Sequence, residues 1–336
     1  MTSKPMRVAV VGVGHMGRHH ARLYREMPQA ELVAVVDTDP KKAQGCAKEH
    51  HTRALASIDD LPDDIHAVSV AVPTIYHRAL TETLLRRGIA VLVEKPLAPS
   101  VEDAEAMLAC ARETGALLSV GHTERFNPVA RALTRLEIQP RYIESQRISP
   151  FRFRSADIGV VADMMIHDID IVLSLVRSRA IRVDAVGVNV LGPHEDVANA
   201  RIAFENGAVA NLVASRLALK TDRRIRVFCD TAYLSLDFQR KSGVAINRDA
   251  NLDIISLAKD KNLDDLAQLA NLDFGKMVNV EPLVIDDVEP LRAELESFLD
   301  SVHKGTPPAV SAEDGVAAVR LASQIVDAIN AHDWKK

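Results

Sequence analysis

Short apolar runs and longer amphipathic segments alternate through the first 125 residues of the chain. Each run holds four to six mostly apolar residues, as a buried strand does, and the next segment repeats its apolar positions with helical spacing. Parallel strands need long crossover connections, so this alternation predicts an α/β Rossmann-type doubly wound parallel sheet. The expected strands span residues 7–12, 32–36, 67–72, 90–93 and 117–120.

The pattern changes after about residue 125, where strand-like runs are joined by short turns. Such spacing is typical of antiparallel hairpins, so we expect a C-terminal α+β domain with an open, mostly antiparallel sheet. One face of this sheet should meet a helix, and the other should form a homo-oligomer surface in a dimer or a tetramer. Residues 241–280 give no clear pattern. The expected strands are 141–149, 183–191, 197–204, 208–217, 224–229 and 233–238, and amphipathic helices are expected over 290–303 and 312–331.

One expected helix, residues 160–176, is apolar almost all round and carries a single polar stripe. At about 100° per residue, the stripe occupies a wedge of roughly 60° and consists of Asp163, His167, Asp170 and Ser174. Asp168 lies off it. Buried carboxylates and imidazoles are costly unless they are paired or used. The stripe therefore indicates either proton-transfer chemistry or a satisfied buried network between domains, and the pattern alone does not choose between them.

A glycine motif lies between the first expected strand and the helix that runs to about Met27. Gly12 permits the tight turn, Gly14 lets the backbone approach a pyrophosphate, and Gly17 lets the helix pack against the strand. Asp37 ends the second strand, where a carboxylate accepts hydrogen bonds from ribose hydroxyls and repels a 2′-phosphate. No basic residue is adjacent to Asp37 in the sequence, so these residues predict NAD rather than NADP as the cofactor.

Composition narrows the possible partners. The chain has 336 residues with 47% hydrophobic residues and a net charge of −5, which argues against general binding to nucleic acid or to an anionic membrane. It has no apolar run long enough to span a bilayer and no leader peptide pattern at its start. Its three cysteines are isolated, and no His, Asp or Glu set has metal-ligand spacing, so we expect a cytoplasmic protein without a metal.

Three motifs occur in an order that resembles the glucose–fructose oxidoreductase / inositol dehydrogenase (Gfo/Idh/MocA) family. They are the glycine motif, Glu94-Lys95-Pro96, and the stripe from Asp163 to Asp170. The segment from Val72-Pro73 to His77 is similar to one that edges the nicotinamide pocket in that family, and residues 311–315 resemble its C-terminal signature. Met165 and the pair at 161–162 depart from the usual residues.

Residues 121–128, 165–170 and 196–201 resemble more narrowly the UDP-N-acetylglucosamine 3-dehydrogenase branch, which supplies a 3-keto sugar nucleotide to an aminotransferase in making diamino sugars for lipid A. The resemblance implies NAD-dependent oxidation of a secondary hydroxyl of a sugar nucleotide, at the 3-hydroxyl of UDP-N-acetylglucosamine. A dehydrogenase of a free sugar or polyol such as an inositol, or a regulator that binds cofactor without catalysis, are the alternatives. The presence of both Lys95 and His167 favours an enzyme.

The family resemblance also implies roles for individual residues. His167 is the expected base because its ordinary pKa is near 6.5, whereas Lys95 would orient the hydroxyl and stabilise the alkoxide. Either could be the actual base. Asp163 would orient His167 or hold the sugar, and Asp170 is either a structural acceptor or a substrate contact. The expected cofactor-binding residues are Gly12, Gly14, His15, Met16, Gly17, Asp37, Pro73, His77, Glu94 and Lys95.

Substrate contacts are expected from the loop after the last parallel strand and from a basic run before the stripe. Arg147, Arg152 and Arg154 form that run, which is either a clamp for a substrate diphosphate or a solvated loop. His19, His20 and the pair at 50–51 are interpreted as surface positions. The full set expected to bind substrate is Lys95, Glu124, Arg125, Asn127, Arg147, Arg152, Arg154, Asp163 and His167.

These expectations divide the chain into three parts. Residues 1–124 form the NAD-binding domain, residues 125–310 the substrate and oligomerisation domain, and residues 311–336 a terminal helix that packs back on the NAD-binding domain.

Overall fold

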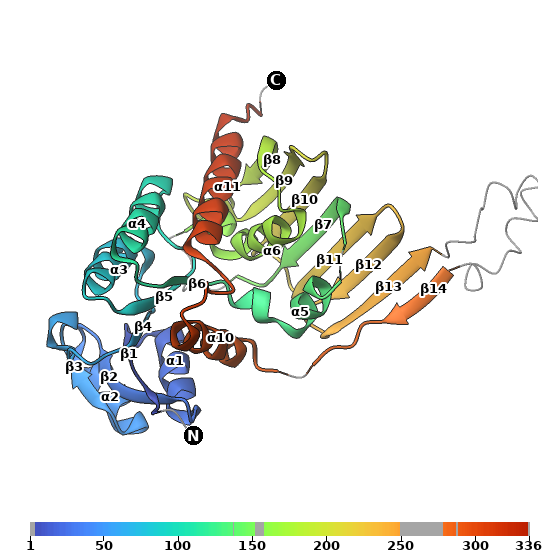
Figure 1. The fold of residues 1–336 in the computed structure, drawn as a ribbon. Coiled ribbons are helices and arrows are strands. Elements are labelled where there is room, and N and C mark those ends of the chain that lie inside the picture. Colours follow the sequence, from blue (N-terminus) through green and yellow to red (C-terminus); the bar gives the residue numbers. More distant parts are fainter. Residues whose placement is uncertain (1–3, 137, 152–157, 249–277, 287, 335–336) are drawn as a thin grey trace, which may run out of the picture.

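The computed structural model describes residues 4–136, 138–151, 158–248, 278–286 and 288–334 (Figure 1). The N-terminal unit is a six-stranded sheet of order β3-β2-β1-β4-β5-β6, and each neighbouring pair is parallel. This confirms the doubly wound sheet, with β3 as a strand that the sequence pattern had not indicated. Its strands are β1 Met6–Val11, β2 Ala30–Val36, β3 Arg53–Leu55, β4 Ala67–Val70, β5 Ala90–Glu94 and β6 Leu118–Gly121.

Capping side chains mark where two helices of this unit, α2 and α4, begin. The Asp39 carboxylate caps α2 by accepting from the amides of Lys41 and Lys42, and Ser100 caps α4 by accepting from the amide of Asp103. Short 3₁₀ turns precede or connect several elements, at Ile58–Asp60, Thr74–Tyr76 and Thr123–Phe126. The helices are α1 His15–Glu26, α2 Pro40–His50, α3 His77–Arg86 and α4 Val101–Thr114.

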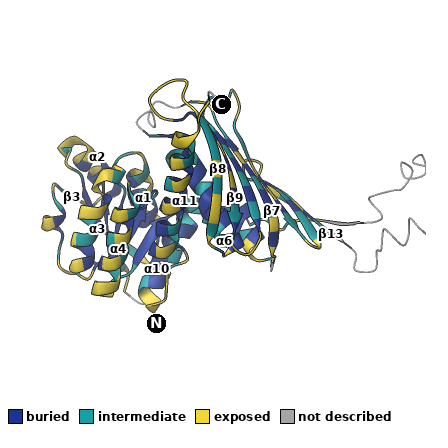
Figure 2. Cartoon of the chain, turned by 90° about the horizontal axis from the view of Figure 1, so that it is seen from above, coloured by how far each residue is buried: buried dark blue, intermediate teal, exposed yellow. Residues whose placement is uncertain are grey.

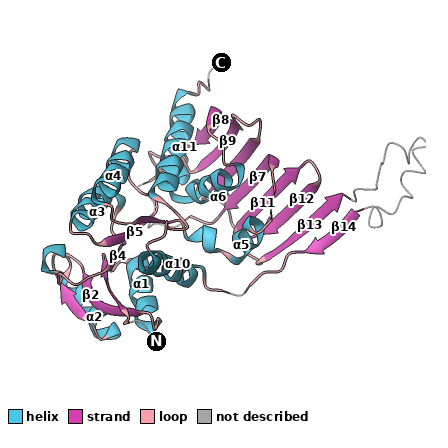
Figure 3. Ribbon diagram, viewed as in Figure 1, coloured by secondary structure: helices cyan, strands magenta, loops and turns pink. Residues whose placement is uncertain are grey.

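The second unit is built on a larger sheet (Figure 3). Within the described ranges it is eight-stranded, of order β14-β13-β12-β11-β7-β10-β9-β8, with β7 and β10 parallel and the other pairs antiparallel. This confirms the mostly antiparallel sheet, and β13 and β14 fall in the part of the sequence without a clear pattern. Its strands are β7 Pro140–Ile148, β8 Ala180–Val188, β9 Val197–Phe204, β10 Val209–Ser215, β11 Asp222–Cys229, β12 Ala232–Asp237, β13 Ser242–Arg248 and β14 Val278–Pro282.

One face of the second sheet is buried beneath helices. Every second residue of β9 and β10 is buried, as a period of two requires when only one face is covered (Figure 2). This face packs on α6 Ile166–Val176, and α5 Pro128–Thr134 adds to the same core. Ile169 of α6 has no exposed surface, and truncating such a residue to alanine costs roughly 2–5 kcal/mol.

The last two helices differ from the expected division of the chain. The helix α10, Pro290–Lys304, lies within the segment assigned to the second domain, yet its Leu295 and Phe298 share a core with α1 and the parallel sheet. The helix α11, Ala312–Ala331, does not pack on the NAD-binding unit alone. Its Val316 joins the core of the parallel sheet and its Ile325 joins the core of the second sheet. Helix α11 therefore connects both units, whereas α10 packs in the core of the first unit.

Among the described residues, no helix combines the length and apolar character needed to cross a membrane. In the same part of the chain, no three His, Cys, Asp or Glu side chains gather where they could hold a metal ion.

Candidate functional site

The turn after β1 has the backbone geometry that a bound pyrophosphate requires. Gly12 has a φ of +84°, and a Cβ atom there would lie 2.6 Å from the Val72 side chain. A Cβ on Gly17 would lie 1.8 Å from the carbonyl oxygen of Gly12, so α1 can approach the strand only with glycine at that position. Gly14 has open space around it, and α1 begins at the next residue with its amides facing that space. These residues fit a dinucleotide cofactor.

Asp37 fixes the adjoining loop. One oxygen of its carboxylate accepts from the amide of Val13 and the other from the amide of Asp39, each at 2.9 Å. The acid therefore ties the end of β2 to the glycine turn and lies beside the region where the ribose of NAD would bind.

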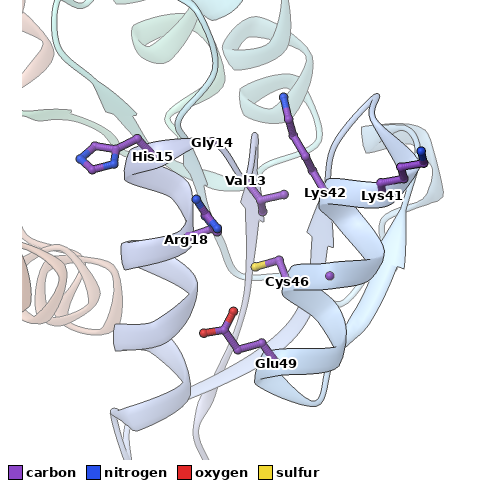
Figure 4. Close-up of a pocket in the computed structure, with 9 residues that line it drawn as sticks. Val13, Gly14, His15, Arg18, Lys41, Lys42, Cys46 and Glu49 are labelled. Carbon is purple, nitrogen blue, oxygen red and sulfur yellow. The ribbon is translucent and has the colours of Figure 1, made fainter. Parts of the chain in front are cut away.

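A cavity of about 520 Å³ opens next to this loop, between α1 and α2 (Figure 4). Arg18 and Lys42 line it, so the folded chain does bring cations near Asp37 although none is adjacent in sequence. His15, an expected cofactor contact, is on its rim. The lining residues are Val13, Gly14, His15, Arg18, Lys41, Lys42, Gly45, Cys46 and Glu49.

His77 is a structural link between two loops. The imidazole is buried, with Nδ1 3.0 Å from the carbonyl oxygen of Pro96 and Nε2 3.0 Å from that of Val72. Burial lowers its pKa, although the backbone hydrogen bonds raise it. His77 therefore holds the two loops together, and its contact with the cofactor stays a prediction. Pro73 is exposed just after the end of β4.

His20 is not a surface residue, as the sequence had suggested. It is 1% exposed, and its Nε2 lies 2.9 Å from Oε1 of Glu94 at the end of β5. Burial alone would raise the pKa of Glu94, but His20 and Lys95 outweigh it and the pKa is lowered. His50 is also buried, so only His51 of the pair at 50–51 is exposed. Helix α1 thus holds the carboxylate that precedes Lys95.

Lys95 reaches from the parallel sheet to the polar stripe. Its Nζ donates to the main-chain oxygen of Asp163 at 2.7 Å and lies 3.5 Å from the Asp163 carboxylate. The two side chains remain 19% and 25% exposed, so both are open to a ligand. Burial lowers the pKa of Lys95, although Asp163 and Glu94 raise it. The structure thus brings two of the three expected catalytic residues into contact.

The stripe lies on a helix whose start is not α-helical. Val161–Met165 form a π-helical turn that leads into α6. His167 follows this turn, and its Nδ1 is buried without a hydrogen-bond partner among the described residues, so Asp163 does not bond to that nitrogen. Burial and the nearby charges of Lys95 and Arg147 hold the pKa of His167 well below 6.5. The imidazole is therefore neutral, and a weaker base than the ordinary pKa suggests.

Asp170 is a structural acceptor. Its carboxylate receives two hydrogen bonds of 2.7 Å from the Arg125 guanidinium, and Asp314 of α11 lies 3.4 Å from the same group. His122 is buried 4.0 Å from Asp170. Arg125, expected to bind substrate, instead joins the loop after β6 to α6 and α11. The Ser174 hydroxyl donates to the carbonyl of Ile171 in its own helix.

A row of alternating charges runs along the sheet beside the stripe. Asp168 accepts two bonds of 2.9 Å from Arg147, and Oε1 of Glu124 lies 3.5 Å from Arg147 and 3.4 Å from Arg223. Arg147 is therefore a buried strand residue and not part of a solvated loop. Burial alone would lower its pKa, but the two carboxylates raise it. Arg223 is the exposed end of the row at 41%.

Four further residues were expected to contact the cofactor or the substrate. Asn127 caps α5 by accepting from the amide of Val129 at 3.0 Å. Met16 is half-buried at the start of α1. Arg152 and Arg154 lie outside the described residues.

Sequence reasoning missed or misplaced several buried polar residues, among them His20, Asp168 and Glu294. Glu294 of α10 accepts from the Thr123 hydroxyl at 2.8 Å, and burial together with Glu94 raises its pKa well above 4.5. A signal existed for each of the three. Leu291, Glu294 and Phe298 follow helical spacing, His20 shares a helix face with Gly17 and Tyr24, and Asp168 is a carboxylate in an apolar helix.

Comparisons with known proteins agree with this geometry. Residues 6–122 match the oxidoreductase family with an NAD-binding Rossmann fold, and residues 136–235 match the GFO/IDH/MocA C-terminal domain. UDP-N-acetylglucosamine 3-dehydrogenase from Acidithiobacillus ferrooxidans is 36% identical over 318 residues, which cover 94% of each chain. Inositol 2-dehydrogenase from Rhizobium meliloti is 25% identical over 342 residues, covering 96% of this chain and 97% of that protein.

The fold is also similar to solved structures. A structure of the Acidithiobacillus ferrooxidans enzyme superposes with a TM-score of 0.87 at 33% identity, covering 98% of this chain and 99% of the other. The identity to that enzyme extends over nearly the whole of both chains, including both matched domains. The chain therefore belongs to the GFO/IDH/MocA family of NAD-dependent oxidoreductases that act on CH–OH groups.

Proposed function

We propose that the protein oxidises the 3-hydroxyl of UDP-N-acetylglucosamine to the 3-keto sugar nucleotide. The observation that carries the proposal is the contact of Lys95 with Asp163, beside His167, at the carboxyl end of the parallel strands. The near full-length similarity to a UDP-N-acetylglucosamine 3-dehydrogenase supports the choice of substrate. Bound NAD supplies the acceptor for the hydride that leaves the carbinol carbon.

The chain's own residues handle the hydroxyl. A charged Lys95 uses one proton on the main-chain oxygen of Asp163, so two remain to hydrogen-bond the substrate oxygen and to stabilise alkoxide charge. His167 is neutral before reaction and can accept the hydroxyl proton. The negative charge that develops on the substrate oxygen favours the imidazolium and offsets the nearby cations that depress its pKa.

A sugar nucleotide also needs a cation for its diphosphate. Arg147 is held by Asp168 inside the sheet, so we assign this role to Arg223, its direct neighbour across β7 and β11. Arg223 is 41% exposed, and its charge is felt at His167. Charge-assisted bonds to phosphate are worth about 1.5–3 kcal/mol each. We therefore expect Arg223→Ala to raise KM for the UDP-sugar by roughly 10- to 100-fold with little change in kcat.

Oxidation of a free polyol is the second candidate, favoured by the similarity to an inositol 2-dehydrogenase over 96% of the chain. The test is NADH formation with UDP-N-acetylglucosamine, free N-acetylglucosamine and myo-inositol, each at the same enzyme and NAD concentrations. Our proposal predicts that the UDP-sugar gives the highest kcat/KM and that both free compounds react poorly. A higher kcat/KM for myo-inositol would replace the proposed substrate with a polyol.

We also propose that copies of the chain associate through the outer face of the second sheet. Every second residue of β9 and β10 points away from the buried face, and the outer face carries the charged side chains of Glu144 and Arg226, 3.4 Å apart within the chain. Sedimentation velocity of the wild type and of Arg226→Glu tests this. We expect a dimer or tetramer that the substitution weakens, whereas a wild type that sediments as a monomer at micromolar concentration would contradict it.

A further inference from the structure

A buried ion pair joins the ends of two neighbouring strands of the second sheet. Asp196 precedes β9 and Arg216 follows β10, and their side chains are 0% and 5% exposed. Oδ1 of Asp196 lies 2.6 Å from Nε of Arg216, and its Oδ2 accepts from the amides of Val190 and Leu191, each at 2.7 Å. Both oxygens of the Asp196 carboxylate thus accept hydrogen bonds, and the Arg216 guanidinium is held in one orientation.

This pair holds the chain just before the polar stripe. Nη1 of Arg216 donates to the carbonyl oxygen of Ile158 at 2.7 Å. The neighbouring Glu195 accepts from the next amides, with its main-chain oxygen 2.9 Å from the nitrogen of Val160 and its Oε1 3.1 Å from that of Val161. The first amides of a helix have no partner inside the helix, so Glu195 supplies them.

The space around Glu195 is equally restricted. A Cβ atom on Gly159 would lie 2.0 Å from Oε1 of Glu195, so glycine at this position lets the carboxylate reach the Val161 amide. The amide of Asp163 bonds to the carbonyl of Gly159 at 3.0 Å. A continuous set of contacts therefore runs from Arg216 and Glu195 to the backbone of Asp163.

The position of that backbone matters because Lys95 is anchored on it. The shorter contact of the Lys95 amine is to the main-chain oxygen of Asp163 at 2.7 Å, not to its side chain at 3.5 Å. Anything that moves the start of the helix moves this acceptor. In catalysis, a misplacement of about 1 Å far from the chemistry can cost roughly a hundredfold in rate.

We propose that Asp196, Arg216 and Glu195 are positioning residues that fix the start of the polar-striped helix and thereby the amine of Lys95. The proposal rests on the assignment of Lys95 as the group that contacts the reacting hydroxyl. According to this proposal, the rate of the reaction depends on three residues that the sequence had not placed in the site.

The first test compares variants that keep or remove individual contacts. Lys at position 216 can reach Asp196 or the Ile158 carbonyl but lacks the fork that reaches both. We expect Arg216→Lys to lower kcat at least threefold and Arg216→Ala at least tenfold, each with a Kd for NAD within twofold of wild type. Glu195→Gln keeps an acceptor for the Val161 amide and should stay within threefold of the wild-type kcat, whereas Glu195→Ala should lose at least fivefold.

The control is Arg141→Ala, which removes a similar Arg–Asp fork, to Asp230, at an exposed position of the same sheet. It should leave kcat unchanged. A second readout needs no substrate, because faster hydrogen exchange of the Val161 amide should accompany loss of rate in Glu195→Ala. Folded Arg216→Ala and Glu195→Ala proteins with wild-type kcat would overturn the proposal, even if their thermal stability fell.

These experiments distinguish failure of the positioning proposal from failure of the proposed function. If the wild type oxidises a free polyol and not the UDP-sugar, the proposed substrate fails, but the same variants compared with wild type on the polyol still test the positioning role. If the wild type oxidises no hydroxyl, unchanged amide exchange in Glu195→Ala and Arg216→Ala overturns the positioning proposal by itself.

Discussion

The amine of Lys95 lies 2.7 Å from the main-chain oxygen of Asp163, which joins the end of a parallel strand to the start of a helix on the second sheet. The reacting groups thus come from both units of the chain. Helix α11 packs against the cores of both units and stabilises this arrangement. The site depends on how the units are held together as well as on the residues in it.

The first prediction concerns Lys95 and His167. Lys95→Ala removes the group that stabilises the alkoxide, and His167→Asn removes the proton acceptor, so each should lower kcat by roughly a hundredfold or more. NAD binding should stay near the wild-type value because the glycine turn and Asp37 are untouched. Initial rates together with calorimetric titration of NAD check this. A variant that keeps wild-type turnover would remove its residue from the mechanism.

The second prediction uses the charge of Asp163. Its carboxylate raises the pKa of Lys95 against the lowering effect of burial. Asp163→Asn removes that charge, so the pKa of Lys95 should fall further. Since the mechanism needs charged Lys95, the alkaline limb of the kcat/KM profile should move to lower pH. The measurement is the pH–rate profile of both proteins, and an alkaline limb at the same pH in each would show that it does not report Lys95.

The sequence predicted the helices and strands whose apolar residues recur at regular spacing, and also the motifs that directly follow those strands. The glycine turn and Lys95 each follow a predicted strand, and the carboxyl ends of parallel strands meet at one edge of a sheet, so their shared location could be predicted. The residues that contact Arg147 could not be predicted. Whether that arginine meets Asp168 or solvent depends on how a strand of the second sheet packs against α6, a long-range contact that no local pattern encodes.

The polar stripe shows the same limit within one helix. Regular α-helical spacing placed Asp163, His167 and Asp170 on one face, but the π-helical turn at Val161–Met165 alters the start of that helix. Asp163 meets Lys95, whereas Asp170 meets Arg125. The sequence therefore predicted which polar residues the helix carries, but not which side chains they contact.

The third prediction concerns cofactor choice. Wild type should bind NAD at least tenfold more tightly than NADP, a difference of about 1.4 kcal/mol or more. Asp37→Ala removes the acceptor for the ribose hydroxyls and the negative charge that opposes a 2′-phosphate, so the preference should decrease. Arg18 and Lys42 line the adjacent cavity, and NADP affinity should rise in this variant.

Adding Lys42→Ala to Asp37→Ala provides the matched control for that measurement. If Lys42 attracts the 2′-phosphate, the double variant should lose the gain in NADP affinity while binding NAD as the single variant does. Titration of all three proteins with NADH and NADPH by fluorescence checks both steps. Equal binding of the two cofactors by wild type would contradict the role given to Asp37.

The fourth prediction concerns stability against pH. Burial lowers the pKa of His77, His122 and His167 in the folded protein, so below about pH 6.5 the unfolded chain binds protons that the folded protein does not. These three groups should therefore lower the stability as pH decreases through 6.5, each by at most about 1.4 kcal/mol per pH unit. Glu294 acts in the opposite direction, because its raised pKa means that the folded protein binds a proton that the unfolded chain does not. Three groups outnumber one, so a net fall in stability is expected.

Denaturant unfolding at several pH values between 5.5 and 7.5 measures that slope. His122→Asn removes one of the three groups, so its stability should fall less with decreasing pH than that of the wild type. A pH dependence that is the same in His122→Asn and in the wild type would contradict a lowered pKa for His122 in the folded protein.

Transfer of the hydrogen at C3 of the sugar tests the proposed function most directly. UDP-N-acetylglucosamine labelled with deuterium at C3 is incubated with the enzyme and NAD. The reduced cofactor is then isolated, and its mass is measured by mass spectrometry. Our account predicts that the deuterium appears in the reduced cofactor and that the keto sugar nucleotide has lost it. Reduced cofactor without deuterium, formed while the sugar nucleotide keeps its label at C3, would contradict oxidation at the 3-hydroxyl.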